Sequence, residues 1–113
     1  MTGSPQRSDV LVIGSGLAGL SLALRLADHT QVTVLAKGDL TQGSSLYAQG
    51  GIAAMLNDGD SFESHIADTL AAGAGLCHRD AVELAVRKGP EAISWLIDQG
   101  VKFTREPGVN GPA

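Results

Sequence analysis

A short run near the N-terminus has the residue types and spacing of a site for a diphosphate. The pattern G-x-G-x-x-G is formed by Gly14, Ser15, Gly16, Leu17, Ala18 and Gly19. The first glycine permits a sharp turn, the second lets a phosphate approach the backbone, and the third lets a helix pack closely on a strand. The amides of residues 15–18 then point at the anion from a helix N-terminus, where the helix dipole favours negative charge. The motif needs no basic side chain.

The segments on either side of this turn predict the elements that must position it. The apolar run 9–13 predicts a strand buried on both faces, as in a parallel sheet. Residues 17–28 have helical spacing, and residues 31–36 predict a second strand rich in β-branched side chains. The fold class is therefore α/β, a Rossmann-like βαβ unit with parallel strands, a right-handed crossover and helices after it. In this frame the glycine pattern indicates a dinucleotide site far more strongly than it does alone.

The end of the second predicted strand leaves the nature of the dinucleotide open. An acidic residue usually stands there to hold the ribose hydroxyls, but this chain has Ala36 followed by Lys37. Asp39 is the nearest acid and lies beyond the strand. A basic residue without the acid also suits the 2′-phosphate of NADPH.

The next segment favours a flavin. A nicotinamide-binding unit normally proceeds to its next helix and strand, whereas residues 43–54 form a glycine-rich loop with Ser44, Ser45 and Gln49 as hydrogen-bonding side chains. Gly50 and Gly51 would let the main chain lie flat against a planar ring. We expect a helical turn around Tyr47 and short strands at 51–55 and 101–104.

Three helices are predicted downstream. Ser61 caps the first, which carries Phe62, Ile66 and Leu70 on one face and ends at Gly73 and Gly75. The second begins at Arg79 or Asp80 and stops at Gly89. The third has Pro90 in its first turn and closes at Gly100.

Composition and charge exclude several classes of protein. Eight basic and twelve acidic residues give a net charge of −4, and the basic residues are scattered, which argues against a nucleic-acid surface. Cys77 is the single cysteine, so an internal disulfide and a cysteine metal site are both excluded, and a reducing cytoplasmic setting is expected. Adjacent His78 points away from it on any regular element, so we interpret Cys77 as structural. No apolar run reaches the roughly 20 residues that a membrane span needs, so no membrane partner is expected.

The loop also carries a family resemblance. Its Ala48-Gln49-Gly50-Gly51-Ile52 run resembles the A-Q-G-G-I signature of the succinate dehydrogenase and fumarate reductase flavoprotein family. Within that family the chain is most similar to the L-aspartate oxidase branch, through residues 34–37, 43–45, 47–54 and 95–101. The resemblance extends from residue 9 to about residue 103.

The resemblance implies an FAD site. Its contacts would be Ser15, Gly16, Leu17 and Ala18 at the pyrophosphate, Lys37 toward the adenosine, and Ser44, Ser45, Leu46, Tyr47, Ala48, Gln49, Gly50 and Gly51 around the ribityl chain and isoalloxazine. Relatives that bind FAD covalently have a histidine where this chain has Ser44, so the FAD here is expected to be non-covalent.

The resemblance further implies an activity for a longer parent protein. That protein would oxidise L-aspartate to iminoaspartate, with oxygen or fumarate reoxidising the flavin, and iminoaspartate would pass to quinolinate synthase in NAD biosynthesis. The family's catalytic arginines and histidines match no residue here, so we assign no catalytic residue and no metal ligand. We expect residues 1–8 to be a flexible tail and residues 9–113 to be the N-terminal part of an FAD-binding domain, the rest of which and the capping domain are absent. The alternatives are another succinate dehydrogenase-like or fumarate reductase-like flavoprotein, an NADPH-dependent reductase, or a non-enzymatic binding module.

Overall fold

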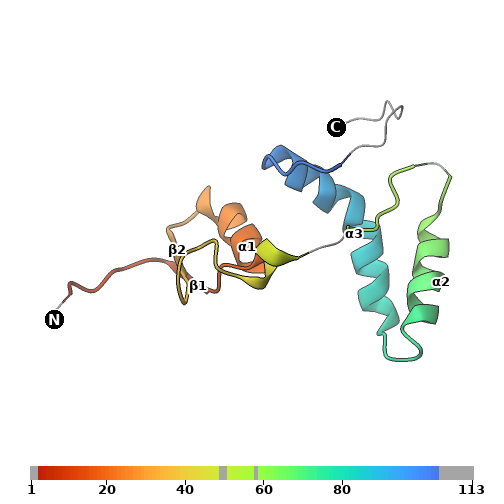
Figure 1. Cartoon of the computed structure of the whole chain (residues 1–113), viewed down its shortest axis with the longest axis horizontal. Helices are drawn as coiled ribbons and strands as arrows, with labels where there is room; N and C mark the ends of the chain where they lie inside the picture. Colours follow the sequence, from red (N-terminus) through yellow and green to blue (C-terminus); the bar gives the residue numbers. More distant parts are fainter. Residues whose placement is uncertain (1–2, 49–50, 58, 105–113) are drawn as a thin grey trace. The chain divides into compact units, whose positions relative to one another are not determined.

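Two structural units divide the chain, residues 1–51 and residues 52–113. The computed structural model describes residues 3–48, 51–57 and 59–104 (Figure 1). The elements in chain order are β1 (Val10–Ile13), α1 (Leu17–Ala27), β2 (Val32–Leu35), the 3₁₀ turn η1 (Ser44–Tyr47), α2 (Phe62–Ala72) and α3 (Arg79–Asp98).

The first unit is built on a βαβ arrangement. β1 and β2 pair in parallel, in a register that sets Val10 against Val32 and Ile13 against Leu35. The helix α1 connects the two strands and packs against both. The predicted α/β class, both strands and the connecting helix are therefore confirmed, with boundaries that differ by one residue.

The sheet is covered on one face among the described residues. Val12 is only 8% exposed, whereas Leu11 and Ile13 on the other face are 54% and 78% exposed. Side chains alternate between the faces of a strand, so a single packed helix covers only one set. The sequence predicted that both faces of the strand are buried. In the described residues only the face that carries Val12 is buried, so the prediction holds for one face and not for the other.

The glycine-rich loop contains one of the two features predicted in it. The helical turn expected around Tyr47 is present as η1. The strand expected at 51–55 is wrong, and so is the strand expected at 101–104, because both segments lack regular structure. A strand is stabilised by pairing with a neighbouring strand, and among the described residues the sheet contains only β1 and β2.

The second unit begins its regular structure at a capped helix. The hydroxyl oxygen of Ser61 accepts a hydrogen bond from the amide of Ser64 at 3.0 Å, as the predicted N-cap requires. The C-cap of α2 is Gly73, and Ala74 and Gly75 then adopt positive φ angles of 48° and 87°. The predicted helix and its end are confirmed.

The two helices predicted after this turn are a single helix. α3 runs without interruption from Arg79 to Asp98 and contains Pro90. Figure 1 shows α3 changing direction along its length, as expected when a proline ring displaces the carbonyl of the preceding turn. Val86 and Ile93 lie on one face two turns apart and are both buried, so the packed face continues across the proline. This continuous burial is the physical reason why the predicted break is wrong.

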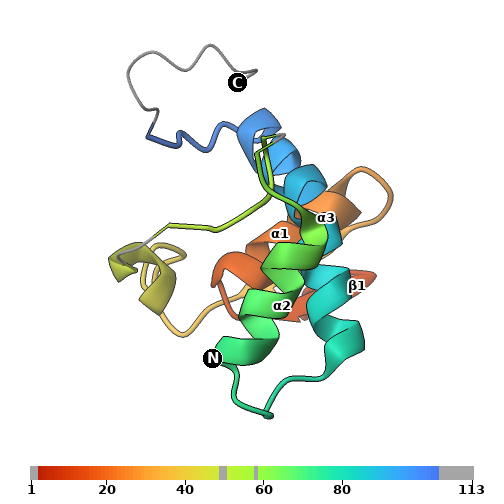
Figure 2. The same ribbon diagram turned by 90° about the vertical axis from the view of Figure 1, so that its right-hand side faces the viewer.

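The helices α2 and α3 lie side by side as an antiparallel pair (Figure 2). Among the described residues of this unit, the buried side chains are Ile66 of α2 and both Val86 and Ile93 of α3. At its surface the Arg87 guanidinium donates to the Glu63 carboxylate at 3.0 Å and lies 5.5 Å from the centre of the Phe62 ring. Of the helices in the described ranges, none is both long and apolar enough to cross a membrane.

Candidate functional site

The predicted glycine turn joins the end of β1 to the start of α1. Gly14 has a φ of +110°, a backbone conformation that residues other than glycine rarely adopt. Its amide donates to the carbonyl of Leu35 at 2.8 Å, so the turn is tied to the end of β2 as well. The first turn of α1 contains no acidic residue, and the amides at the helix start therefore face no competing negative side chain of that turn.

The other two glycines differ in what surrounds them. A Cβ at Gly19 would collide with the carbonyl oxygen of Gly14 and lie 3.3 Å from Val12 Cγ1, so Gly19 is required by helix–strand packing. Gly16 has φ −72° and ψ 175°, which any residue can adopt. A Cβ at Gly16 would meet only Ser45 Oγ, at 3.7 Å. The fold itself therefore does not require glycine at position 16, and the space there is left for a ligand.

A pocket lies at this end of α1. Ser45 on η1 accepts a hydrogen bond from the amide of Leu17 at 3.3 Å, which brings the glycine-rich loop onto the start of the helix. The pocket has a volume of about 280 Å³ and is lined by Ser15, Leu17, Leu20, Leu40, Thr41, Gly43, Ser45 and Leu46. The structure thus brings together residues from two of the three predicted groups of contacts.

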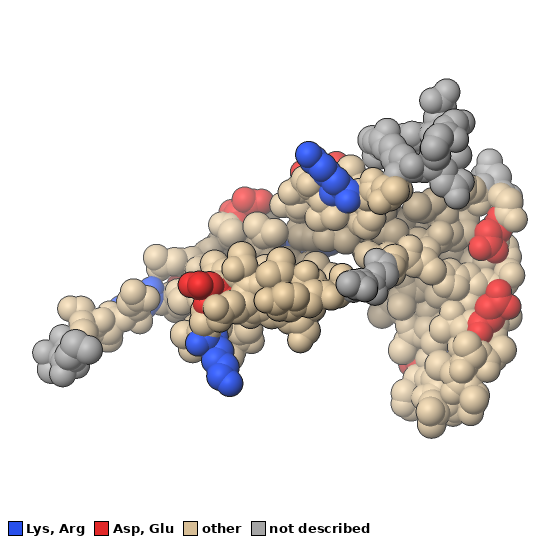
Figure 3. All heavy atoms as spheres, viewed as in Figure 1, with Lys and Arg blue, Asp and Glu red and all other residues tan. Residues whose placement is uncertain are grey.

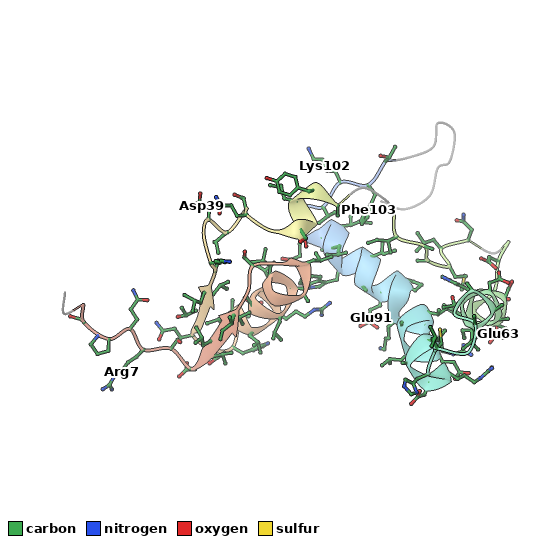
Figure 4. All side chains as sticks on the ribbon, turned by 60° about the horizontal axis from the view of Figure 1, so that its bottom comes forward. Arg7, Asp39, Glu63, Glu91, Lys102 and Phe103 are labelled. Atoms are coloured by element: carbon green, nitrogen blue, oxygen red, sulfur yellow. The ribbon has the colours of Figure 1, made fainter. Side chains whose placement is uncertain are left out.

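Lys37 lies at the end of the sheet where both parallel strands finish, which is the end that carries the glycine turn. It follows β2 by two residues, and parallel strands end on the same side, so it lies near the glycine turn and is exposed. Asp39 is on the loop beyond it and points away from the strands (Figure 4). The structure therefore leaves the end of β2 without the carboxylate that usually holds a ribose.

The remaining predicted contacts are spread along the loop. Ser44, Leu46 and Tyr47 lie on η1, and Ala48 caps it; all four are exposed. Gly51 is exposed in irregular backbone, and Gln49 and Gly50 lie outside the described residues.

Leu20, Leu40, Thr41 and Gly43 line the pocket but were not predicted as contacts. The position of Leu20, one helical turn after Gly16, was a usable signal. No pattern marked the other three, because they come near the helix only through the path of the loop.

The charged groups with altered acidity lie away from this pocket. The Gln31 amide and then the Thr30 hydroxyl hydrogen-bond to the Asp9 carboxylate, at 3.0 Å and 2.9 Å, and lower its pKa. The pKa of Glu63 is also lowered, first by a hydrogen bond from the backbone of Glu63 itself to its carboxylate and then by the hydrogen bond from the Arg87 guanidinium. Figure 3 shows single basic and acidic side chains on the viewed face and no cluster of either sign. No residue that lines the pocket is charged, so beside its leucine side chains the polar groups that it offers a ligand are backbone groups and hydroxyls.

Cys77 and His78 lie in the turn before α3. Cys77 is partly buried and its Sγ lies 3.9 Å from the Thr69 carbonyl oxygen, while His78 is the N-cap residue of α3. These positions agree with the structural role that the sequence indicated for Cys77.

The fold and the pocket define a dinucleotide-binding βαβ unit, and comparison with known proteins defines its family. Residues 9–112 match the family described as the FAD binding domain. The chain belongs to this family, and FAD is its cofactor. The open space at Gly16, the helix N-terminus and the Ser45 hydroxyl fit a pyrophosphate, so the residues present agree with that cofactor. The NADPH alternative raised by Ala36 and Lys37 is thereby answered in favour of FAD.

The chain is similar to curated proteins over most of its own length. It is 62% identical to the L-aspartate oxidase of Pseudomonas aeruginosa over 98 residues, which are 87% of this chain and 18% of that protein. It is 60% identical to the L-aspartate oxidase of Yersinia pestis, over 92% of this chain and 20% of that protein. The chain thus spans about a fifth of the length of these relatives.

Solved structures show the same fold. A mutant FrdA of the E. coli quinol fumarate reductase superposes with a TM-score of 0.82 and 33% identity, over 88% of this chain and 18% of that one. The Sdh1 complex of Mycobacterium smegmatis superposes with a TM-score of 0.80 and 31% identity over the same shares.

Proposed function

We propose that this chain is the FAD-binding N-terminal portion of an L-aspartate oxidase. The observation that carries the proposal is the 62% identity to the Pseudomonas aeruginosa L-aspartate oxidase, which extends over 87% of the chain. In the proposed reaction L-aspartate would lose a hydride from its α-carbon and a proton from its amino group to give iminoaspartate, and FAD, when bound, would supply the hydride acceptor. Oxygen or fumarate then takes the electrons. The residues of this chain hold and orient the flavin, while the redox chemistry belongs to the cofactor.

The activity is tested by reducing the flavin of the full-length protein under nitrogen. L-aspartate is expected to bleach the flavin absorption, and succinate is expected to do so much more slowly. Admission of air or of fumarate should restore the absorption and identify the acceptor. Bleaching by succinate but not by L-aspartate would contradict the proposal.

A second candidate is a fumarate reductase-like or succinate dehydrogenase-like flavoprotein. The TM-score of 0.82 to the E. coli fumarate reductase FrdA favours it. The lower sequence identity, 33% against 62%, makes it the weaker candidate. The same anaerobic experiment separates the two.

We also propose that FAD is held without a covalent bond. The support is Ser44, because a serine hydroxyl cannot supply the imidazole nitrogen that bonds the flavin methyl group in covalent relatives. Acid precipitation of the full-length protein should leave a yellow supernatant and a colourless pellet. Flavin that stays with the pellet would contradict this proposal.

The proposed placement of the pyrophosphate on the glycine turn is tested with Gly16→Val. The backbone at Gly16 suits valine, so the variant should fold, while its side chain would fill the space left for the phosphate. The flavin content of the purified full-length variant should fall to a few per cent of wild type. Gly59→Ala, which lies outside the pocket and whose Cβ would have nothing within 4 Å, is the control for a general effect of losing a glycine. Unchanged flavin content in Gly16→Val would show that the pyrophosphate binds elsewhere.

The proposal has three further parts. Residues 9–113 would form the N-terminal part of the FAD-binding domain, preceded by a flexible tail at residues 1–8. The enzyme would act in the cytoplasm, and iminoaspartate would pass to quinolinate synthase. Trapping iminoaspartate with purified quinolinate synthase, supplied with the three-carbon co-substrate that quinolinate formation requires, tests the last part, since quinolinate should accumulate only when both proteins are present.

A further inference from the structure

We propose that Gln42 binds the adenosine ribose of FAD, in place of the acidic residue that usually does so at the end of the second strand. In this arrangement the carboxamide oxygen of Gln42 accepts a hydrogen bond from a ribose hydroxyl. The inference rests on the proposed placement of the pyrophosphate on the glycine turn, because that placement directs the adenosine toward the end of β2. It adds to the site a residue that the sequence did not mark.

The first observation is that the described residues place no carboxylate at the end of β2. Ala36 follows the strand directly, and the ammonium group of Lys37 after it has only donors. Asp39 lies on the loop beyond and points away from the strands (Figure 4). A ribose bound there without an acceptor would lose hydrogen bonds that its hydroxyls make with water. Binding therefore favours an acceptor that comes from the following loop.

The second observation places the Gln42 carboxamide at this end of the strand. The Gln42 amide donates to the Asp39 carbonyl at 2.8 Å, so the chain turns back over residues 39–42. The Gln42 side chain lies over Gly38, which follows the last residue of β2 by three positions. A Cβ on Gly38 would collide with Gln42 Oε1 and stand 3.2 Å from Gln42 Cδ. The glycine thus leaves room for the carboxamide beside the backbone.

The third observation concerns what the carboxamide can bind. Gln42 is exposed, and its side chain makes no hydrogen bond with any residue that the structure describes. A carboxamide oxygen accepts hydrogen bonds as a carboxylate oxygen does, but more weakly because it carries no charge. It can therefore take the part of the missing acid toward a ribose hydroxyl, with the smaller effect of a neutral hydrogen bond.

The test compares ADP with 2′,3′-dideoxy-ADP, which keeps the pyrophosphate and the adenine but lacks both ribose hydroxyls. Binding of each to the flavin-stripped full-length protein is measured by titration calorimetry. Gln42→Ala should weaken ADP about three- to tenfold and leave 2′,3′-dideoxy-ADP unchanged, because only the hydrogen bond to a hydroxyl is lost. Gln42→Glu keeps an acceptor and should retain the preference for ADP. Gln31→Ala removes a carboxamide at the other end of β2 and is the matched control, which should leave the binding of both ligands unchanged.

Gly38→Ala tests the placement of the side chain by an independent route. The added Cβ would displace the carboxamide, which is the flexible end of an exposed side chain, so the fold should persist while ADP binding weakens as in Gln42→Ala. Because both substitutions remove the same contact, Gly38→Ala should cause no further loss in a Gln42→Ala background. Additive losses would show that the two residues act separately and would overturn the inference.

Three results with the Gln42 variants would also overturn it. These are equal weakening of ADP and 2′,3′-dideoxy-ADP by Gln42→Ala, unchanged ADP binding in Gln42→Ala, and loss of the preference for ADP in Gln42→Glu. Gly16→Val separates these results from failure of the proposed site, because ADP binding that survives in Gly16→Val refutes the placement of the pyrophosphate. Loss of ADP binding in Gly16→Val together with unchanged binding in Gln42→Ala refutes the Gln42 inference alone.

Discussion

Gly16 and Gly19 belong to one sequence pattern but have different physical reasons to be glycine. At position 19 a side chain would meet backbone, because the helix lies against the turn and against Val12. At position 16 a side chain would meet open space and one hydroxyl. Substitutions at the two positions should therefore alter different properties of the protein, stability at one and ligand retention at the other.

Gly19→Ala is expected to lower the stability of the fold. The added Cβ collides with the Gly14 carbonyl oxygen, so the helix must move away from the strand, at a cost of about 1–3 kcal/mol. The melting temperature of the flavin-stripped full-length protein should fall. Gly59→Ala, whose Cβ would have nothing within 4 Å, should leave it unchanged. Equal melting temperatures for Gly19→Ala and wild type would contradict the close packing described here.

Asp9 gives the sheet a dependence on pH. The Gln31 amide and the Thr30 hydroxyl lower the pKa of this carboxyl in the folded protein below its ordinary 3.8. The stabilising contribution is therefore complete above the unfolded pKa of about 4 and is lost as pH falls through the lower folded value. In Asp9→Asn the loss of stability between about pH 5 and pH 2 should be shallower than in wild type, as measured by urea unfolding at each pH. Parallel curves for the two proteins would show that Asp9 makes no such contribution.

The residues of the candidate site were predicted unevenly. The glycine turn was predictable because its chemistry is local and depends on spacing alone. The bond between Ser45 and Leu17 joins residues 28 positions apart, so it depends on how the loop returns to the helix. Leu40 and Thr41 enter the pocket for the same reason. Patterns in sequence predict what a segment is, and they predict less well which segments meet.

At the scale of elements, α3 shows packing overriding local signals. Gly89 and Pro90 predicted a break, since one lowers helix propensity and the other removes a hydrogen bond. The helix continues because burial of Val86 before the pair and of Ile93 after it favours one packed face. The two strands predicted at 51–55 and 101–104 failed for the complementary reason, since apolar residues alone do not make a strand without a neighbour to pair with.

Gly89→Ala is expected to stabilise α3. Gly89 is helical, and beyond its two chain neighbours a Cβ there would make only an ordinary contact of 3.6 Å with Ala54 Cβ, so the substitution stabilises the fold by reducing chain entropy in the unfolded state. The Pro90 ring opposes part of this effect, because its Cδ crowds a Cβ on the preceding helical residue, so the net gain should be below about 0.5 kcal/mol and should appear as a slightly higher melting temperature of the full-length protein. Gly100→Ala is the matched contrast, because Gly100 has a φ of +95° and an alanine there would be strained. A lower melting temperature for Gly89→Ala would mean that α3 needs the flexibility of that glycine.

At the scale of the whole molecule, much of the apolar surface is not covered by other described residues. The open side of α1 and β2 forms an apolar hollow of about 300 Å³, lined by Leu20, Ala23, Leu24, Ala27, Val32 and Val34. The buried hydrophobic side chains among the described residues are Val12, Ala23, Ile66, Val86 and Ile93. Burial of apolar area is the main favourable term in folding, and so small a core offsets little of the chain entropy.

A polypeptide of residues 1–113 is therefore expected to be marginally stable by itself. Its two-stranded sheet has exposed edges and one exposed apolar face, and sheets of this size need further packing to persist. Circular dichroism should show helix signal that declines gradually on heating, without a cooperative transition, and the dye ANS should bind to the exposed apolar surface. The full-length protein measured in parallel should melt sharply and bind little dye. A sharp melting transition of the short polypeptide would show that the two small cores suffice.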